Sequence, residues 1–335
     1  MVTMAEVAAR AGVAKQTVSN VLTGKAAVRP ATAARVHAAI AELGYTPNLV
    51  ARSLATGSTM TVGLVVATVA NPFYAEVVEQ VENALDGTGY HLLLCTTRGD
   101  AQRTRRHLES LTSRNIDALL IAGDSNLINH LPLLADVSFP VALCAWETEI
   151  PDSLPVVTID YEQAGFLAGR HLRELGHHKV AVIAERPHEW RLEGLRRAFA
   201  RDGLTVGDEW VFEPTESSPD GGHTAAVQAL AAHPDLTAIF TTNDILALGA
   251  LDAVRESGRS VPGQVSVVGF DDIAQVGRAH PALTTVAIPK REMAEQAVRL
   301  LLNAIAEQRA PTNSLQLLRP RLIPRASSGP APADG

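Results

Sequence analysis

The chain has 335 residues, of which 46% are hydrophobic and 19% charged, and this is the composition of a folded globular protein. Its length exceeds that of one compact core and suits a small domain joined to a larger, two-lobed one. No apolar run reaches the ~18 residues needed to span a bilayer, and the N-terminus lacks the basic and apolar regions of a secretory signal. We therefore expect a cytoplasmic protein with no membrane partner.

The net charge of −7 is unevenly distributed along the sequence. Residues 1–58 contain six Lys and Arg side chains against two Glu side chains, which gives +4 and leaves −11 for the rest of the chain. A basic head attracts phosphate groups, whereas an acidic body does not. The asymmetry is typical of a DNA-binding segment joined to an acidic sensor domain.

Three short helices are predicted at the N-terminus. The sequence TMAE at 3–6 is a capping box, so a helix begins there, and Gly12 permits the turn that ends it. A second helix is expected over residues 15–22. A third is expected over residues 30–43, because Pro is a favoured first helical residue and Gly44 a favoured C-cap. Short helices joined in this way form a helix-turn-helix unit.

The pattern changes after this unit. Residues 48–55 are helical in pattern but too few to be stable alone in water. Beyond them, apolar strand-like runs alternate with amphipathic helices; the runs are TVGLVVA, HLLLC, DALLIA, PVALC, PVVTI, KVAVIA, TAIFTT and VSVVGF. This alternation predicts an α/β fold with parallel sheets covered by helices on both faces, and the strands are too many for one ordinary sheet. Residues 326–335, rich in Ser, Pro, Ala and Gly, are expected to form a disordered tail.

The segments VTMAEVAARAGVAKQTVSNVLTGK and YTPNLVARSLATG closely resemble the headpiece and hinge of the LacI/GalR family of transcription regulators. Further on, NPFYAEVVEQVE, HLRELGHHKVAVIA, FTTNDILALGAL and VSVVGFDD resemble that family's periplasmic-binding-protein-like core. The resemblance implies an all-α helix-turn-helix headpiece with a hinge helix at 1–58. It also implies an effector-binding and dimerising core of two parallel doubly wound sheets at 60–325.

The same resemblance implies a repressor rather than an enzyme, with no cofactor and no metal. We expect a homodimer that binds palindromic operator DNA and responds to a small effector, a sugar or a sugar derivative. A tetramer is not expected, because the C-terminal sequence ASSGPAPADG has no heptad repeat.

Residues at the start of the second helix are the candidates for reading base edges in the major groove. Lys15 can donate to guanine, Gln16 can bond to both edge atoms of adenine, and Asn20 lies one turn further on. Phosphate contacts are expected from Thr3, Thr17 and Ser19. Two departures from the family pattern, Ala14 and Arg29, stand where Ser or Thr usually caps the second and third helices, so these helices are expected to lack a side-chain N-cap.

The segment that resembles the hinge helix carries three further candidates. In the family, paired leucines wedge into the minor groove at the centre of the operator and kink the DNA. Leu54 occupies that position in this chain. Asn48 and Arg52 are expected to hold phosphates nearby.

Candidate effector-binding residues follow the predicted core strands, because ligands of open α/β sheets bind at the carboxyl ends of strands. The polar candidates suit a polyol, and an aromatic ring can pack against a sugar. They are Asn71, Phe73, Trp146, Asp160, Arg191, Asn243 and Asp271. Asp244 and Asp272 are expected to cap helices outside the site.

Three other interpretations compete with this one. A free solute-binding protein would share the core fold but not the headpiece. An enzyme is disfavoured, because the sequence contains no nucleophile elbow, P-loop, GxGxxG or paired metal ligands, and His177-His178 lie in a surface-like turn. A nucleobase or a protein corepressor in place of the sugar remains open.

Overall fold

The structure, a computed structural model, describes residues 2–24, 26–46, 53, 57–113, 116–123, 125–134, 137–309 and 313–332. The chain divides into two compact units, one formed by Met1–Thr61 and the other mainly by Val62–Ser113 and Ala118–Gly335. Among the described residues, no helix is both long and apolar enough to cross a membrane. We refer to the first unit as the headpiece and to the second as the core.

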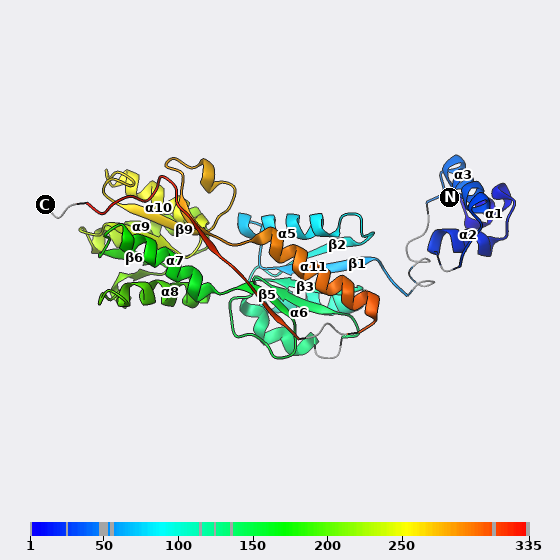
Figure 1. The fold of residues 1–335 in the computed structure, drawn as a ribbon, viewed down its shortest axis with the longest axis horizontal. Helices are drawn as coiled ribbons and strands as arrows, with labels where there is room; N and C mark the ends of the chain where they lie inside the picture. The colour runs from blue at the N-terminus through cyan, green and yellow to red at the C-terminus, as the bar shows by residue number, and fades with distance from the viewer. Residues whose placement is uncertain are drawn as a thin grey trace. The chain divides into compact units, whose positions relative to one another are not determined.

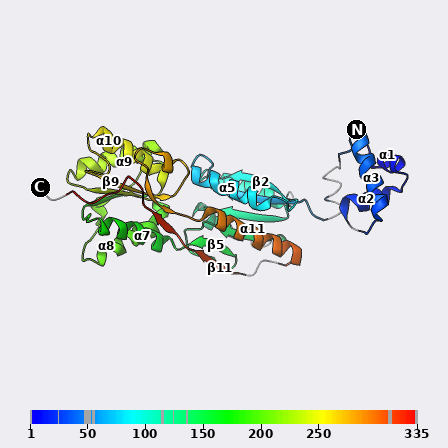
Figure 2. The same cartoon turned by 45° about the horizontal axis from the view of Figure 1, so that its top comes forward.

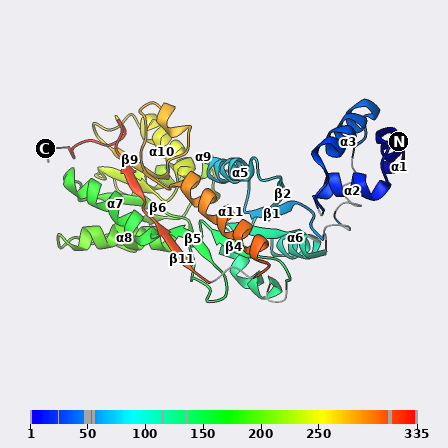
Figure 3. The same cartoon turned by 45° about the vertical axis from the view of Figure 1, so that its right-hand side comes forward.

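The headpiece contains the three predicted helices, α1 (Met4–Ala11), α2 (Lys15–Thr23) and α3 (Pro30–Leu43), packed together in Figure 3. The capping box is present, with the backbone N–H of Glu6 bonded to the Thr3 hydroxyl and the backbone N–H of Thr3 bonded to the Glu6 carboxylate. Neither α2 nor α3 has a side-chain N-cap, as Ala14 and Arg29 predict. The predicted helix-turn-helix unit is therefore confirmed.

The core consists of two six-stranded sheets, one in each lobe. The first sheet has the order β11-β5-β4-β3-β1-β2, and its strands are β1 (Thr61–Val66), β2 (His91–Thr96), β3 (Ala118–Ala122), β4 (Val141–Cys144), β5 (Val156–Ile159) and β11 (Leu315–Leu318). The second has the order β12-β10-β9-β8-β6-β7, and its strands are β6 (Val180–Ile183), β7 (Val211–Phe212), β8 (Ala238–Thr241), β9 (Ser266–Asp271), β10 (Thr284–Ala287) and β12 (Arg321–Ile323). Pairing in the second sheet is parallel except between β10 and β12. The predicted fold, a helical headpiece followed in the sequence by two parallel sheets, is confirmed, except that β12 pairs antiparallel with β10.

Helices cover these sheets. In the second lobe, α7 (Tyr161–Glu174) and α8 (Glu189–Ala200) lie on one face, and α9 (Pro219–Ala232) and α10 (Asp244–Glu256) lie on the other (Figures 1 and 2). In the first lobe, α5 (Pro72–Leu85) and α11 (Lys290–Glu307) pack side by side. The remaining helical segments are α6 (Ala101–Ser113), η1 (Ser125–Leu134), η2 (Arg186–His188), η3 (Asp208–Trp210) and η4 (Val276–Arg278).

The chain crosses between the lobes after β5, after β10 and again between β11 and β12. Figure 1 shows the last crossing as the red segment that runs along both lobes. Because the strands of each parallel sheet end toward these crossings, polar residues that follow the strands of both lobes can meet there.

The expectation of a disordered tail is wrong for residues 326–332. Ser327 is fully buried: its hydroxyl accepts from the backbone N–H of Thr284 at 2.8 Å and donates to the carbonyl of Val267 at 2.6 Å. Its own backbone bonds Val267 and Ala282. The composition is typical of a disordered segment, but backbone groups near the starts of β9 and β10 form hydrogen bonds with it. Residues 333–335 lie outside the described residues.

His177 is likewise buried, so its expected place in a surface turn is wrong. Its Nδ1 lies 2.9 Å from the Thr237 hydroxyl, and its Nε2 lies 3.0 Å from the carbonyl of Gly329. Burial lowers the pKa of His177, which favours the neutral ring. Its one proton is placed on Nε2, because the carbonyl of Gly329 can only accept. This residue therefore helps to hold the C-terminal segment on the second lobe.

We expect Ser327→Ala to lower the free energy of unfolding of the core by about 1–3 kcal/mol, because the buried N–H of Thr284 loses its acceptor. Urea unfolding followed by circular dichroism measures the change. The same substitution at the exposed Ser138 is the control and should change stability by less than about 0.5 kcal/mol. Equal stability of Ser327→Ala and the wild type would contradict the packing described for this segment.

Candidate functional site

The predicted base-reading residues lie on α2, which buries Val18 against the other headpiece helices. Lys15 and Gln16 are exposed, and the Gln16 side-chain amide donates to the Asn20 amide oxygen at 3.1 Å. Thr17 and Ser19 are half-buried on the same helix. This surface offers DNA a cation and two amides one helical turn apart.

Thr3 has a structural role that is already visible in the headpiece, since its hydroxyl caps α1. A phosphate contact from its hydroxyl stays a prediction. The other three DNA-binding candidates, Asn48, Arg52 and Leu54, lie outside the described residues.

The core contains a cavity of about 210 Å³ between residues of the two lobes, which is small for a ligand site and suits a compact molecule. It is lined by residues that follow β1 to β5 in the first lobe and β6 to β9 in the second. The side chains that line it include Asn71, Phe73, Tyr74, Trp146, Glu147, Tyr161, Glu185, His188, Arg191, Ser217, Asn243 and Asp271.

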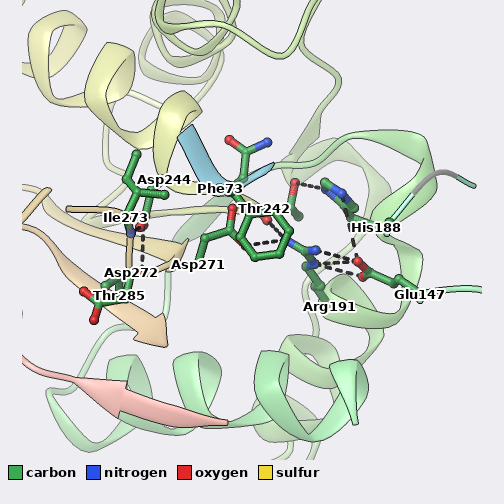
Figure 4. A network of polar contacts seen from close by, with 12 residues as sticks. Phe73, Glu147, His188, Arg191, Thr242, Asp244, Asp271, Asp272, Ile273 and Thr285 are labelled. Atoms are coloured by element: carbon green, nitrogen blue, oxygen red, sulfur yellow. Dashed lines mark hydrogen bonds and ion pairs between the residues drawn. The ribbon is translucent and has the colours of Figure 1, made fainter. Parts of the chain in front are cut away.

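Arg191 on α8 is the central polar group of this cavity and is 4% exposed. Its guanidinium makes a two-pronged ion pair with Glu147, with Nε–Oε1 and Nη2–Oε2 distances of 2.8 and 2.5 Å, and it donates to the carbonyl of Thr242 (Figure 4). Burial disfavours its charge, but Glu147 and Asp271 raise the pKa of Arg191 above its usual value. Arg191 therefore stays charged and ties the two lobes together.

Close helix packing sets the position of Arg191. A Cβ added at Gly165 on α7 would lie 2.0 Å from the carbonyl oxygen of Arg191, and one added at Gly194 on α8 would lie 1.9 Å from that of Glu162. Only glycine allows α7 and α8 to approach this closely. The guanidinium then stacks over the ring of Phe270, 4.1 Å from its centroid.

Three carboxylates line the same cavity. Burial raises the pKa of Glu147 and of Asp271 to about 7 each, although the charge of Arg191 lowers both. Burial also raises the pKa of Glu185. The Oδ1 atom of Asp271 is buried without a hydrogen-bond partner, and its nearest cation, Nη1 of Arg191, is 3.5 Å away. An acceptor in this state is suited to a hydroxyl or ammonium donor of a ligand.

The loop that carries Asp271 has a strained backbone. Asp271 and Asp272 have φ values of 111° and 53°, a region that L-residues rarely adopt. The Lys290 ammonium binds both of their carbonyls, at 2.6 and 2.9 Å, and the Asp244 carboxylate accepts from the backbone N–H of Ile273 at 2.9 Å. Such conformations persist only where their surroundings enforce them, and here they direct Asp271 into the cavity.

The capping roles expected for Asp244 and Asp272 are wrong. Asn243 caps α10 instead, accepting from the backbone N–H of Leu246, and Asp272 pairs with Arg325. Asp244 is fully buried and also accepts from the Thr285 hydroxyl at 2.6 Å. Neither aspartate lines the cavity, as expected.

An amide and an imidazole of the second lobe complete its side of the cavity wall. Asn243 donates its amide N–H to Glu185 and to the Ser217 hydroxyl. The His188 Nδ1 lies 3.1 Å from the Thr242 hydroxyl, and burial holds the pKa of His188 well below its usual value, so the ring is neutral.

The first lobe contributes aromatic rings and a capping amide. The ring of Phe73 is 5% exposed, and Asn71 caps the helix that begins beside it. The Tyr74 hydroxyl donates to the carbonyl of Gly123. The Trp146 indole is 1% exposed and donates to the carbonyl of Glu149 at 3.1 Å.

Six of the seven predicted effector residues thus line one cavity: Asn71, Phe73, Trp146, Arg191, Asn243 and Asp271. Asp160 does not. It is exposed, and its carboxylate caps α7 by accepting from the backbone N–H of Gln163 at 2.7 Å, so the expected effector contact from Asp160 is wrong. Sequence reasoning missed Tyr74, Glu147, Tyr161, Glu185, His188 and Ser217. Glu147 and Glu185 follow β4 and β6, so the same rule of strand ends could have found them.

The sequence matches two family models. Residues 3–48 match the bacterial regulatory proteins of the lacI family, and residues 170–328 match a periplasmic-binding-protein-like domain. The chain is similar to the HTH-type transcriptional repressor PurR of Proteus mirabilis (strain HI4320), with 34% identity over 338 residues, 99% of this chain and 98% of that protein. This chain belongs to the LacI family of bacterial transcription regulators.

Solved structures agree with this assignment. The chain resembles the complex of the transcriptional regulator CelR with cellobiose, with 32% identity, a TM-score of 0.73, and coverage of 98% of this chain and 100% of that one. It also resembles the lac repressor dimer bound to operator and the anti-inducer ONPF, with 27% identity, a TM-score of 0.85, and coverage of 98% and 99%. The protein is therefore a DNA-binding transcription regulator and not an enzyme.

Proposed function

We propose that this protein is a cytoplasmic repressor that binds a palindromic operator as a homodimer and changes its operator affinity when a small sugar or sugar derivative enters the core cavity. The α2 surface with Lys15, Gln16 and Asn20 would read base edges, and Leu54 in the hinge segment would wedge into the minor groove. A single observation carries the proposal: the cavity is lined by both lobes, so a ligand there contacts both and can favour one lobe arrangement over another.

The chemistry of the cavity supports a sugar. Asp271 has a buried acceptor without a hydrogen-bond partner, and hydroxyl groups supply donors for it. Phe73 offers a ring on which the apolar face of a sugar can pack. The similar regulator CelR is described as a complex with cellobiose. A nucleobase is the competing ligand, because its N–H groups are also donors.

The twofold symmetry of a palindromic operator requires a homodimer. Two helix-turn-helix units must meet two half-sites, so a palindromic site requires a twofold partner. Light scattering of the free protein should give the mass of a dimer, and a stable tetramer or a monomer at micromolar concentration would contradict this part of the proposal.

Selection from a random duplex library tests DNA binding and yields the operator sequence in the same experiment. We expect the protein to enrich a palindrome whose half-sites lie about one helical turn apart. A thermal-shift screen of sugars and nucleobases then tests the ligand, because a ligand that binds only the native state raises its melting temperature. Enrichment of sequences without twofold symmetry would overturn the first part, and stabilisation by nucleobases alone would overturn the second.

Gln16→Ala should weaken binding to the selected operator by about 1–3 kcal/mol and relax the preference at one symmetric base position, because a two-bond contact to a base edge is lost. Fluorescence anisotropy with the operator and its single-base variants measures both effects. The control is Gln102→Ala on the exposed face of α6 in the core, which should bind like the wild type. An unchanged base preference in Gln16→Ala would remove Gln16 from the readout.

A further inference from the structure

The cavity carries more negative than positive charge. Among its lining residues in the described part of the chain, the carboxylates of Glu147, Glu185 and Asp271 face a single cation, Arg191, and His188 is neutral. Glu147 and Asp271 are nearly fully buried, with side chains 9% and 4% exposed. Any ligand must therefore be compatible with this local excess of carboxylates.

Arg191 would be the partner for an acidic ligand, but its guanidinium N–H groups already bond to other groups of the protein. Its Nε lies 2.8 and 2.9 Å from the two carboxylate oxygens of Glu147, and its Nη2 lies 2.5 Å from one of them. Its Nη1 donates to the carbonyl of Thr242. The forked face that would pair with a carboxylate or phosphate is thus covered by Glu147.

A second cation, Lys290, offsets only part of this negative charge. Burial raises the pKa of Asp271, and the charge of Lys290 lowers it only in part, while Glu76 beside Lys290 raises it again. The Lys290 ammonium donates to the carbonyls of Asp271 and Asp272 and pairs with Glu76 at 3.0 Å, and it does not line the cavity. Oδ1 of Asp271 is the buried side-chain acceptor that the described part of the chain leaves open for a ligand donor.

We propose that the cavity selects a polyol without negative charge, either neutral or amine-bearing, and that Glu147 enforces this selection by covering Arg191 and adding its own charge. This inference rests on the proposed function, since it concerns the ligand class of the same site. Hydroxyl and ammonium groups satisfy the open acceptor of Asp271, whereas a phosphorylated or acidic sugar meets like charges within a few ångströms. In a poorly hydrated site such a clash costs more than tenfold in affinity.

The test uses the full-length protein and isothermal titration calorimetry with matched ligands. It is made at about pH 8, above the pKa values of about 7 of Glu147 and Asp271. The panel contains glucose, galactose, ribose and cellobiose, together with glucosamine, galactosamine, glucuronate, galacturonate, glucose 6-phosphate and ribose 5-phosphate. We expect at least one neutral or amino sugar to bind, and its acidic counterpart to bind at least tenfold more weakly.

Two variants assign the selection to Glu147. Glu147→Gln keeps the size of the side chain and an acceptor for Arg191 but removes the charge, so the affinity for the acidic counterpart should rise at least tenfold relative to the neutral sugar. Glu149→Gln makes the same change on an exposed neighbour and should keep the wild-type preference.

Three results would overturn the inference: an acidic sugar that binds the wild type as tightly as its neutral parent, no binding by any member of the panel, or an unchanged preference in Glu147→Gln. Failure of the proposed function is recognised separately, because the selection of operator DNA needs no sugar. A protein that prefers neutral sugars but enriches no palindrome would leave the ligand class standing and reject the repressor.

Discussion

Arg191→Ala is expected to abolish the response to the effector while leaving the operator affinity of the unliganded protein intact. Arg191 holds Glu147 in place and is the cation nearest to Asp271, so its loss leaves two buried carboxylates of the cavity without their partner. Removing one partner of a buried, hydrogen-bonded charge pair typically costs 2–5 kcal/mol, and we expect ligand affinity to fall roughly 30- to several-thousand-fold. A ligand shifts a conformational equilibrium only through its differential affinity for the two states. A receptor that no longer binds its ligand therefore stays in the unliganded state.

The ion pairs of the arginines on α8 provide a matched control for this experiment. Arg191 pairs with Glu147, whereas its helix neighbour Glu193 pairs with Arg196, so Arg191 is directed into the cavity rather than along α8. Its loss leaves buried carboxylates unpaired, and the melting temperature should fall as well. Arg197→Ala, which removes an exposed arginine of the same helix paired with Glu162, is the matched control.

The readout is anisotropy of labelled operator DNA titrated with the sugar identified in the screen. Arg197→Ala should respond at the wild-type midpoint, and Arg191→Ala should show no response up to at least 30-fold higher concentration. A response of Arg191→Ala at the wild-type midpoint would remove Arg191 from the site.

Asp244→Ala should strongly destabilise the core, by roughly 2–6 kcal/mol. Its fully buried carboxylate accepts hydrogen bonds from the N–H of Ile273 and the hydroxyl of Thr285. Each buried donor left without a partner lowers the free energy of unfolding by about 1–3 kcal/mol. Because the Ile273 contact also holds the strained loop that carries Asp271, ligand affinity should fall together with stability.

Asp244→Asn separates hydrogen bonding from charge at this position. The amide oxygen can accept from the N–H of Ile273, and the amide N–H can donate to the Thr285 hydroxyl, so most of the stability and ligand affinity should be kept. Urea unfolding and calorimetry measure the two effects. Wild-type stability of Asp244→Ala would contradict the role given to this carboxylate.

Local signals in the sequence were sufficient for much of the fold. The headpiece helices followed from caps and apolar spacing, and the eight predicted strands are all present. Four strands were missed, β7, β10, β11 and β12. β7 has only two residues, and β11 exposes Leu315 and Leu317 at a sheet edge, so neither shows the continuous apolar run of a buried parallel strand.

In the site, too, residues placed by a neighbouring strand are predictable from the sequence, whereas contacts between distant residues are not. The sequence predicts three of the site residues because they follow strands, and the carboxyl ends of parallel strands lie at the same edge of a sheet. These residues are Arg191, Asn243 and Asp271. The ion pair of Glu147 with Arg191 joins residues 44 positions apart, and periodicity does not reveal such pairs. Asp160 also follows a strand but caps a helix, which shows that the rule selects the correct end of the sheet without selecting the direction of each side chain.

In the proposed regulator, operator binding and ligand binding are coupled, and thermodynamic reciprocity tests this coupling. The operator dissociation constant is measured with and without saturating sugar, and the sugar dissociation constant is measured with and without saturating operator. Coupling requires the two ratios to be equal and, for a regulatory site, to lie at about 5–150-fold. Ratios of one in both directions, with the sugar bound in the cavity, would show that the cavity does not regulate operator binding.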